Sequence, residues 1–412
     1  MRRGFSLGIV GLLAIAGIVG ACSGGGDTGT GGTGAATAGH GPGGGTTGGT
    51  GGTSTGGSGG ITGGTGGTGG SGGTGATGGS GGTGATGGGG PVPSGWLYTQ
   101  PGDNQIYLSD GQSGSVWMGR GVHFDDLFLC GYNTGLWMSN PDGEQALLEV
   151  ASNMMADWQP TFVRVSLGMN SYDPVVSWIG SSTYKTAMTN VINAIGAHAG
   201  TYVLVTLRSD TTMVDTNGNT CGQGDDAVCL PSNASDAVYE ELVTSFQNDG
   251  YVLFGIANEP GGMSATDQHL SQLMAHAVGV IRAKEDSLGV PHHIVSVQGN
   301  QWTSRIGFYD GAPLAYDNVV YEYHSYPPEA TGNNGYTQAN IPVIIGEYGP
   351  SGADLSFLTG FYADVEAKHI PNLAWTLSPF SNCAPDLVAA NQNTTLTPTA
   401  WGTAVQSYLL AH

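Results

Sequence analysis

The sequence feature that most constrains the fold is a series of short apolar runs that alternate with longer segments of helical periodicity. The runs are rich in β-branched residues, as buried strands are, and cover residues 116–122, 161–167, 201–207, 251–257, 293–298, 318–323, 342–346 and 372–376. The segments between them predict helices over residues 144–157, 184–197, 236–248, 266–286 and 354–368. Strands that alternate with helices indicate βαβ units and a parallel sheet.

Eight such runs within one domain favour a closed barrel over an open sheet. The predicted fold class is therefore α/β, a (β/α)8 TIM barrel. The alternative, a doubly wound open sheet, is expected to carry a Gly-x-Gly-x-x-Gly turn after its first strand, and the sequence has none there. In a barrel, functional side chains gather at the C-terminal ends of the strands.

The N-terminus predicts an exported protein. Arg2 and Arg3 precede an apolar stretch, which is the layout of a secretory signal peptide over residues 1–21. The small residues that lead into Cys22 resemble the bacterial lipobox. That resemblance implies lipidation of Cys22 and an anchor in the outer membrane or at the cell surface. The alternatives are an ordinary signal peptide with extracellular release, and an uncleaved anchor helix.

Residues 22–94 predict a flexible linker, because they are dominated by Gly and Thr and cannot bury enough apolar surface to offset chain entropy. Glycine is doubled and proline is nearly absent, which excludes a collagen triple helix. Residues 95–412 then form one globular domain, which the motifs described below predict to be catalytic.

The globular domain is strongly acidic. The chain has 10 Lys and Arg against 31 Asp and Glu, and only Arg2, Arg3 and Asp27 of these precede residue 95, so the domain keeps 8 basic and 30 acidic residues and a net charge of −22. Such a field repels nucleic acids and anionic lipids, so no nucleic-acid partner is expected. It is compatible with a neutral sugar polymer bound by a monomer.

Four cysteines remain once Cys22 is set aside, and four cysteines allow three pairings. In an oxidising compartment two disulfides are expected. Cys221 and Cys229 enclose a short loop and form one candidate pair; Cys130 and Cys383 follow the first and last strands, which are neighbours in a closed barrel. A zinc site is the alternative, but the sequence has no Cys-x-x-Cys, so no metal is expected.

Two glutamates end two of the predicted strands. Glu259 lies in an Asn-Glu-Pro motif after the fourth run, and Glu347 lies in a Gly-Glu-Tyr motif after the seventh. Hydrolysis of a glycosidic bond needs two carboxyl groups, one protonated to donate to the leaving oxygen and one ionised to attack or to activate water. Either glutamate alone could be a salt-bridged strand-end residue. The pair favours a glycosidase, which needs no metal or organic cofactor.

Five elements in this order resemble glycoside hydrolase family 5, the large family that contains the cellulases. They are Asn258-Glu259-Pro260, the His-x-Tyr element His324-Ser325-Tyr326, the strand that ends in Glu347, Trp375 on the eighth strand and Arg164 on the second, and the match covers most of residues 115–405. The resemblance implies a retaining β-glycosidase with Glu259 as acid/base and Glu347 as nucleophile. It also implies supporting roles: Arg164 and Tyr326 hydrogen-bond Glu347, Asn258 binds the sugar 2-hydroxyl, His324 contacts the substrate or Glu259, and Trp375 stacks on a sugar ring. Purely structural roles are the alternatives for Arg164, Asn258, His324 and Trp375.

The third predicted strand departs from the family, which often has a histidine near the substrate there. Arg208 stands at this strand end, and either replaces that contact or belongs to a loop that is built differently. The long polar segment 209–235 is expected to shape the cleft. Trp302, after the fifth strand, is a candidate sugar platform, with core packing as the alternative.

The leading function is an endo-β-1,4-glucanase that acts on a polysaccharide or oligosaccharide. A β-mannanase or an exo-β-1,3-glucanase uses the same residues. A non-catalytic carbohydrate-binding surface protein belongs to a different class, and such a protein would be expected to have lost Glu259 or Glu347, whereas both are present.

Overall fold

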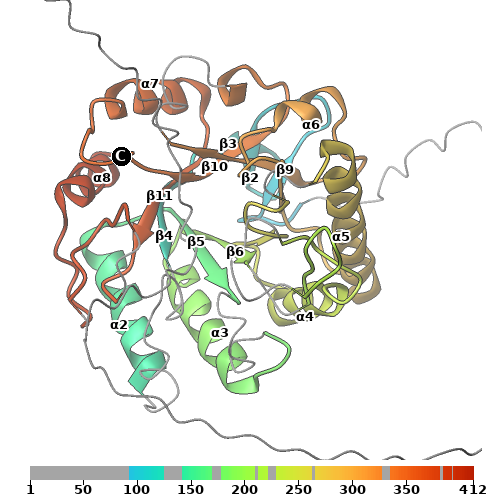
Figure 1. Cartoon of the computed structure of the whole chain (residues 1–412), viewed down its shortest axis with the longest axis horizontal. Coiled ribbons are helices and arrows are strands. Elements are labelled where there is room, and N and C mark those ends of the chain that lie inside the picture. The colour runs from blue at the N-terminus through green and yellow to red at the C-terminus, as the bar shows by residue number, and fades with distance from the viewer. Residues whose placement is uncertain are drawn as a thin grey trace, which may run out of the picture. The chain divides into compact units, whose positions relative to one another are not determined.

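The computed structural model describes residues 92–124, 142–168, 178–208, 212–220, 229–261, 265–326, 335–380, 384–391 and 393–412. Eight parallel strands form a closed barrel in the order β10-β11-β4-β5-β6-β7-β8-β9 (Figure 1). The barrel strands are β4 (Arg120–Phe124), β5 (Phe162–Leu167), β6 (Tyr202–Leu207), β7 (Val252–Gly255), β8 (Val295–Gln298), β9 (Val319–Ser325), β10 (Val343–Tyr348) and β11 (Asn372–Leu377). The predicted (β/α)8 barrel is confirmed.

Helices surround this barrel (Figure 1). They are α2 (Asp142–Asp157), α3 (Ser182–Gly196), α4 (Asp236–Phe246), α5 (Asp267–Leu288), α6 (Gly307–Gly311), α7 (Leu358–Lys368) and α8 (Ala400–Leu410), and a 3-10 turn, η4, spans Gly335–Gln338. The short α6 and the terminal α8 were not predicted. Helix α8 follows a Thr- and Asn-rich segment, and it begins where the Thr399 side chain accepts a hydrogen bond from the Gly402 nitrogen at 3.0 Å.

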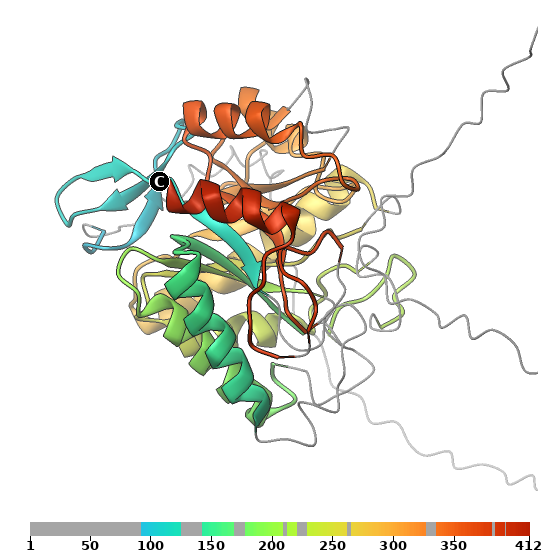
Figure 2. The same cartoon turned by 90° about the vertical axis from the view of Figure 1, so that its left-hand side faces the viewer.

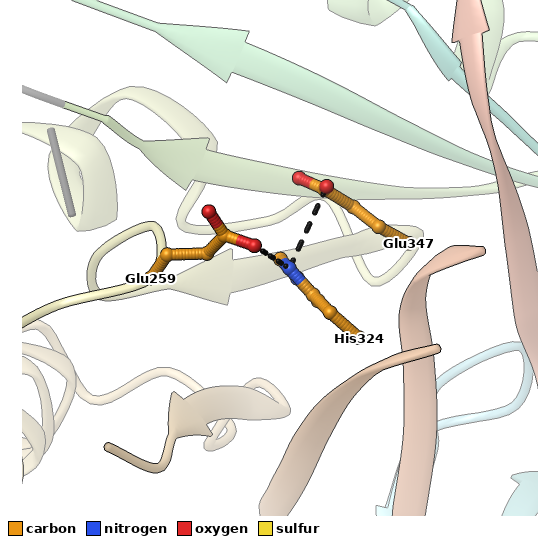
Figure 3. Close-up of side chains that lie close together, drawn as sticks. All are labelled: Glu259, His324 and Glu347. Atoms are coloured by element: carbon orange, nitrogen blue, oxygen red, sulfur yellow. Dashed lines mark hydrogen bonds and ion pairs between the residues drawn. The ribbon is translucent and has the colours of Figure 1, made fainter. Parts of the chain in front are cut away.

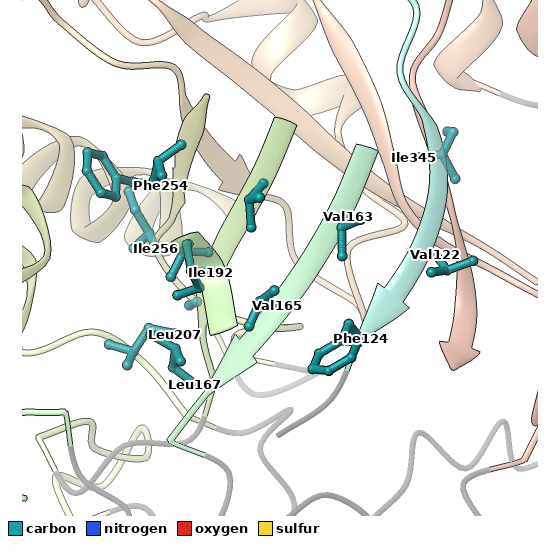
Figure 4. Close-up of a cluster of buried hydrophobic side chains, with 14 of the residues drawn as sticks. Val122, Phe124, Val163, Val165, Leu167, Ile192, Leu207, Phe254, Ile256 and Ile345 are labelled. Carbon is teal, nitrogen blue, oxygen red and sulfur yellow. The ribbon is translucent and has the colours of Figure 1, made fainter. Parts of the chain in front are cut away.

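The main hydrophobic core lies between the strands and the helices. Helix α3 shows how it forms: Ser181 caps the helix by accepting from the Tyr184 nitrogen at 3.2 Å, and the buried residues that follow recur at helical spacing. Ile192 of this helix belongs to the same buried cluster as Val165 and Leu167 of β5 (Figure 4). Each fully buried aliphatic side chain of this kind stabilises the fold by about 1.5–3 kcal/mol.

A small antiparallel sheet precedes the barrel and was not predicted. Its strands are β1 (Leu97–Thr99), β2 (Ile106–Ser109) and β3 (Gly114–Val116), seen in cyan at the left of Figure 2. Leu97, Ile106 and Trp117 pack against residues near the starts of the barrel strands, namely Phe162, Tyr202, Leu204, Leu253, Val320, Ile344 and Leu373. This sheet therefore closes the N-terminal end of the barrel.

Seven barrel strands agree with the predicted runs to within two residues at each end, but the first does not. The prediction of one strand over 116–122 is wrong, because Val116 ends β3 and the barrel strand begins at Arg120. Trp117 turns inward and packs edge-on against Phe162 at 5.0 Å and Tyr202 at 5.3 Å between ring centroids. A Cβ atom at Gly119 would collide with the Trp117 ring, so this glycine allows the chain to turn there.

Several sequence predictions fall on residues outside those that the structure describes. Among them are the signal peptide over 1–21, Cys22, nearly all of the linker, and Cys130, Cys221 and Cys383. Cys229 is disulfide-bonded, and its pairing with Cys221 stays a prediction. Within the described ranges, the structure contains no helix that is both long and apolar enough to cross a membrane.

Candidate active site

The predicted site residues converge at the C-terminal side of the barrel. Arg164 lies on β5, His324 on β9, Glu347 on β10 and Trp375 on β11, while Asn258 and Glu259 follow β7, Trp302 follows β8 and Tyr326 follows β9. This is the end of a TIM barrel where active sites form, since the loops there bring side chains from different strands together.

Glu347 is held through both of its carboxylate oxygens. Arg164 Nη1 donates to Oε1 at 2.6 Å, and the Tyr326 hydroxyl donates to Oε2 at 3.0 Å. The side chain is almost wholly buried. Both contacts expected from the sequence are present, and together they fix the direction in which the carboxylate points.

Arg164 connects several groups of the site. Its guanidinium is completely buried, and it donates to Glu347, to Asn258 Oδ1 at 2.7 Å and to Thr206 Oγ1 at 3.2 Å, with Glu322 Oε1 at 3.1 Å. A buried cation is costly unless it is paired and hydrogen-bonded, and here it is both. Because the Asn258 oxygen faces Arg164, the orientation of that amide is fixed.

Glu259 stands on a constrained piece of backbone. Its φ is +45°, in the left-handed region that non-glycine residues rarely adopt. Its backbone N–H donates to Gln298 Oε1 at 2.5 Å, and its carboxylate Oε1 lies 2.8 Å from His324 Nδ1. The backbone and the side chain of Glu259 are therefore both held by neighbouring strands.

His324 lies between three carboxylates. Its Nδ1 faces Glu259 and Glu347 (Figure 3) and lies 3.5 Å from Glu347 Oε2. Its Nε2 lies 3.0 Å from Glu322 Oε1. Burial lowers the pKa of His324, but the charges of Glu347 and Glu259 and the hydrogen bonds to Glu259 and Glu322 more than offset this, and raise that pKa to about 9. The ring is an imidazolium at neutral pH.

Glu322 is a site residue that the sequence analysis did not single out. It is fully buried in β9, and Ser296 Oγ donates to its Oε2 at 2.7 Å. Burial raises the pKa of Glu322, but the Arg164 charge and the hydrogen bond from His324 outweigh it and lower that pKa to about 2. The sequence contained a signal, since a carboxylate inside an apolar strand run is costly unless it is paired.

The three side chains Glu259, His324 and Glu347 are the one group with metal-ligand spacing in the described part of the chain. One candidate ligand atom from each lies within 4.8 Å of the others. Metal ligation requires a neutral imidazole. Because both His324 nitrogens face carboxylates and the ring is protonated at neutral pH, the donor set suits proton transfer better than metal binding.

Three further residues line or approach this group. Trp375 is only 3% exposed, and it meets the His123 ring edge-on at 4.4 Å. The Arg208 guanidinium lies over the Trp375 ring, 5.1 Å from its centroid, and its Nη1 is 3.7 Å from Glu347 Oε1. Arg208 therefore reaches the site from the end of the third barrel strand, where the sequence departs from the family pattern.

Trp302 has a different environment from Trp375. Its side chain is 37% exposed, and residues 301–303 all have positive φ values between 52° and 62°. Thr303 Oγ1 donates to Gln298 Oε1 at 2.8 Å, which ties this segment to β8. The fixed backbone presents an aromatic ring at the surface, and the core-packing alternative does not fit that exposure.

Comparisons with known proteins agree with this fold. The family model of cellulases, glycosyl hydrolase family 5, matches residues 126–381. The catalytic domain of an endoglucanase from Thermobifida fusca is 17% identical, covers 77% of this chain and 97% of its own, and has a TM-score of 0.55. A β-glucanase from Saccharophagus degradans in complex with cellotetraose is 15% identical, covers 78% of this chain and 94% of its own, and has a TM-score of 0.58.

A β-mannanase from Streptomyces thermolilacinus is similar as well, at 16% identity, with 75% of this chain and 93% of that chain covered and a TM-score of 0.51. No curated protein matches the sequence at a significant level. At these identities the solved structures show the fold alone. The family model spans more than half of the chain and includes both Glu259 and Glu347.

Proposed function

Since the chain belongs to the cellulase family, glycosyl hydrolase family 5, and is a glycosidase, we propose that it cleaves a β-1,4-linked glucan internally and with retention of anomeric configuration. The observation that carries the retaining mechanism is that a carboxylate oxygen of Glu259 and one of Glu347 lie within 4.8 Å of each other. Retaining glycosidases hold their carboxyl groups about 5–5.5 Å apart, whereas inverting enzymes leave about 6.5–9.5 Å for a water molecule.

The reaction proceeds in two steps on these two residues. Glu347, aimed by Arg164 and Tyr326, attacks the anomeric carbon while Glu259 delivers a proton to the leaving oxygen. A covalent glycosyl-enzyme forms on Glu347. Water then attacks it, with Glu259 accepting the proton of the water, so Glu259 serves first as acid and then as base.

The supporting residues act on the sugar at the cleavage point. The Asn258 amide, oriented by Arg164, is placed to bind the 2-hydroxyl, and Trp375 forms the floor of the subsite. Arg208, between Trp375 and Glu347, takes the place of the third-strand histidine that other family members often have. Trp302 offers an exposed ring to a neighbouring sugar unit.

A neutral β-glucan is the favoured substrate. The net charge of −21 disfavours anionic polysaccharides by long-range repulsion. The fold resembles an endoglucanase and a β-glucanase that binds cellotetraose. A β-mannanase activity is the second candidate, because a β-mannanase of similar fold is also found.

We also propose that the mature protein is lipidated on Cys22 and displayed at the outer membrane or cell surface. The basic N-terminus, the apolar stretch and the small residues before Cys22 support this proposal. Mass spectrometry of the N-terminal peptide from a bacterial host tests it. An unmodified Cys22 in the mature protein would contradict it.

Hydrolysis of soluble polysaccharides tests the catalytic proposal. Carboxymethyl-cellulose, mixed-linkage β-glucan, glucomannan, galactomannan, laminarin and xylan are compared for the wild type, Glu259→Gln and Glu347→Gln. Cleavage of a β-1,4-glucan that both variants lose supports the proposal, and preference for galactomannan moves the assignment to a mannanase. Activity that survives both substitutions would mean that other carboxylates perform the reaction.

A further inference from the structure

A third carboxylate, Glu322, lies behind the two that the reaction uses. Its side chain is fully buried, so it does not reach a bound sugar. A buried ion pair is in general weak support for stability, since desolvation offsets much of the attraction. A role in the chemistry of the site therefore explains the burial of Glu322 better than a role in stability does.

The geometry connects Glu322 to Glu259 through one imidazole ring. Glu322 Oε1 lies 3.0 Å from His324 Nε2, and Glu259 Oε1 lies 2.8 Å from His324 Nδ1. The two carboxylates thus occupy both nitrogens of the same ring. Ser296 Oγ donates to the other Glu322 oxygen at 2.7 Å, which fixes the carboxylate in place.

The other charged groups around His324 do not displace Glu322 or Glu259 from the nitrogens of its ring. Glu347 Oε2 lies 3.5 Å from Nδ1, and Arg164 is paired with both Glu347 and Glu322. Burial, together with the Arg164, Arg208 and His324 charges, lowers the pKa of His123 well below its usual value, so His123 is neutral.

We propose that Glu322 is a positioning residue that keeps His324 protonated. The Glu259–His324 pair thereby holds the proton that the leaving oxygen receives. This inference rests on the proposed function. In the resting enzyme the imidazolium donates a hydrogen bond from Nδ1 to ionised Glu259. As the glycosidic bond breaks, one proton passes through Glu259 to the leaving oxygen and His324 becomes neutral. The water that attacks the glycosyl-enzyme returns one proton to the pair.

The alkaline limb of the pH–rate profile reports loss of that proton. Glu322→Gln keeps the shape of the side chain and removes its charge, so the pair should lose its proton at lower pH. We expect the alkaline limb of kcat/KM to move down by about one pH unit or more, because an opposite charge at this distance shifts a pKa by about 1–3 units. The readout is kcat/KM for an aryl β-glycoside with a poor leaving group, made from the sugar that the wild type cleaves.

Two controls separate this effect from a general disturbance. Ser296→Ala removes a hydrogen bond to the same carboxylate but no charge, and its alkaline limb should stay close to that of the wild type. A dinitrophenyl glycoside needs no proton for its leaving group, so its kcat/KM should show no such shift in Glu322→Gln. An unchanged alkaline limb in Glu322→Gln overturns the proposal, as does an equal shift in Ser296→Ala or with the dinitrophenyl substrate.

A second measurement needs neither activity nor folding of a variant at position 322. In the wild-type enzyme labelled with 15N-histidine, His324 should have both ring nitrogens protonated at neutral pH, with the signal assigned by its loss in His324→Asn. A neutral His324 ring at pH 7 overturns the inference. A wild type that cuts no β-glycan contradicts the proposed function instead, and the NMR result then still tests whether His324 is protonated.

Discussion

The side chain of Gln298 holds the backbone of Glu259, with its Oε1 2.5 Å from the Glu259 nitrogen. The same oxygen accepts a hydrogen bond from Thr303 in the segment that carries Trp302. One buried amide therefore links Glu259, the proposed acid/base, to the exposed aromatic ring. The link matters because Glu259 has a left-handed backbone, a conformation that costs on the order of 1–3 kcal/mol for a non-glycine residue and persists only when its surroundings hold it.

Replacing Gln298 by Leu should impair both catalysis and stability. The Glu259 N–H would lose its acceptor, at a cost of about 1–3 kcal/mol, and displacement of the acid/base by a fraction of an ångström up to one ångström should lower kcat by roughly 10- to 100-fold. Urea denaturation and steady-state kinetics measure the two effects. Thr303→Val is the matched control, since it removes the other bond to Gln298 and should lower kcat far less.

Glu259→Gln should discriminate between substrates by their leaving groups. The variant lacks the acid, which contributes roughly 10²–10⁴-fold, so a natural β-glycan should be cut slower by about that factor. An aryl glycoside with an activated leaving group should still form the glycosyl-enzyme, and azide should then replace water and restore turnover. The product to detect is a β-glycosyl azide; an α-linked azide would contradict retention through Glu347.

Trp302→Ala should weaken binding of long chains without affecting the fold. The ring is partly exposed, so the melting temperature should change little. Loss of a stacking contact worth about 0.5–1.5 kcal/mol should raise KM for a polysaccharide several-fold. Trp302→Phe should recover part of that loss, and kcat on a short aryl glycoside should stay unchanged. An equal KM increase on the short substrate would place Trp302 away from the outer subsite.

His292 should make stability depend on pH. Its Nδ1 lies 2.9 Å from Asp317 Oδ2, and this hydrogen bond is the main cause that raises the pKa of His292 above 6.5 and lowers the pKa of Asp317 below 3.8. A histidine whose pKa is raised by folding stabilises the fold at pH values below its pKa in the unfolded chain. This stabilisation is lost as the pH rises through its pKa in the folded state. A lowered aspartate pKa stabilises the fold above 3.8 and loses its effect as the pH falls.

The pair therefore stabilises the fold most at pH values between the unfolded-state pKa of Asp317 and that of His292. His292→Gln should accordingly lower the melting temperature more near pH 5 than near pH 8.5. Calorimetry at the two pH values measures the difference. His276→Gln, at an exposed histidine paired with Asp236, is the control and should change little at either pH. An equal fall in the melting temperature of His292→Gln at both pH values would contradict an explanation based on the charge of His292.

The barrel could be predicted from the sequence because its strands are continuous apolar runs with helical segments between them. The N-terminal sheet could not, since β1, β2 and β3 have only three or four residues each and β3 is exposed throughout. Such strands are too short to show a period. Their position depends on Trp117, whose inward turn is decided by contacts with Phe162 and Tyr202 far along the chain.

The two glutamates could be located because motifs place them at strand ends, whereas the residues that support them depend on contacts across the barrel. Gln298 and Glu322 point inward from strands, and what each touches follows from register. Strands β9 and β10 are irregular between Ile345 and Glu347, and a Cβ atom at Gly346 would collide with the Glu322 carboxylate. That glycine makes room for a buried charge, a relationship that spacing along the sequence does not reveal.

The closed end of the barrel also decides how this enzyme could be mounted on a support. Val92 lies at that end, where its carbonyl accepts a hydrogen bond from Ser109 Oγ at 2.8 Å, opposite the strand ends that carry Glu259 and Glu347. A bead, a scaffold protein or a sensor surface joined ahead of Val92 would be attached at the end of the barrel opposite Glu259 and Glu347. In that orientation the end of the barrel that carries Glu259 and Glu347 faces away from the support.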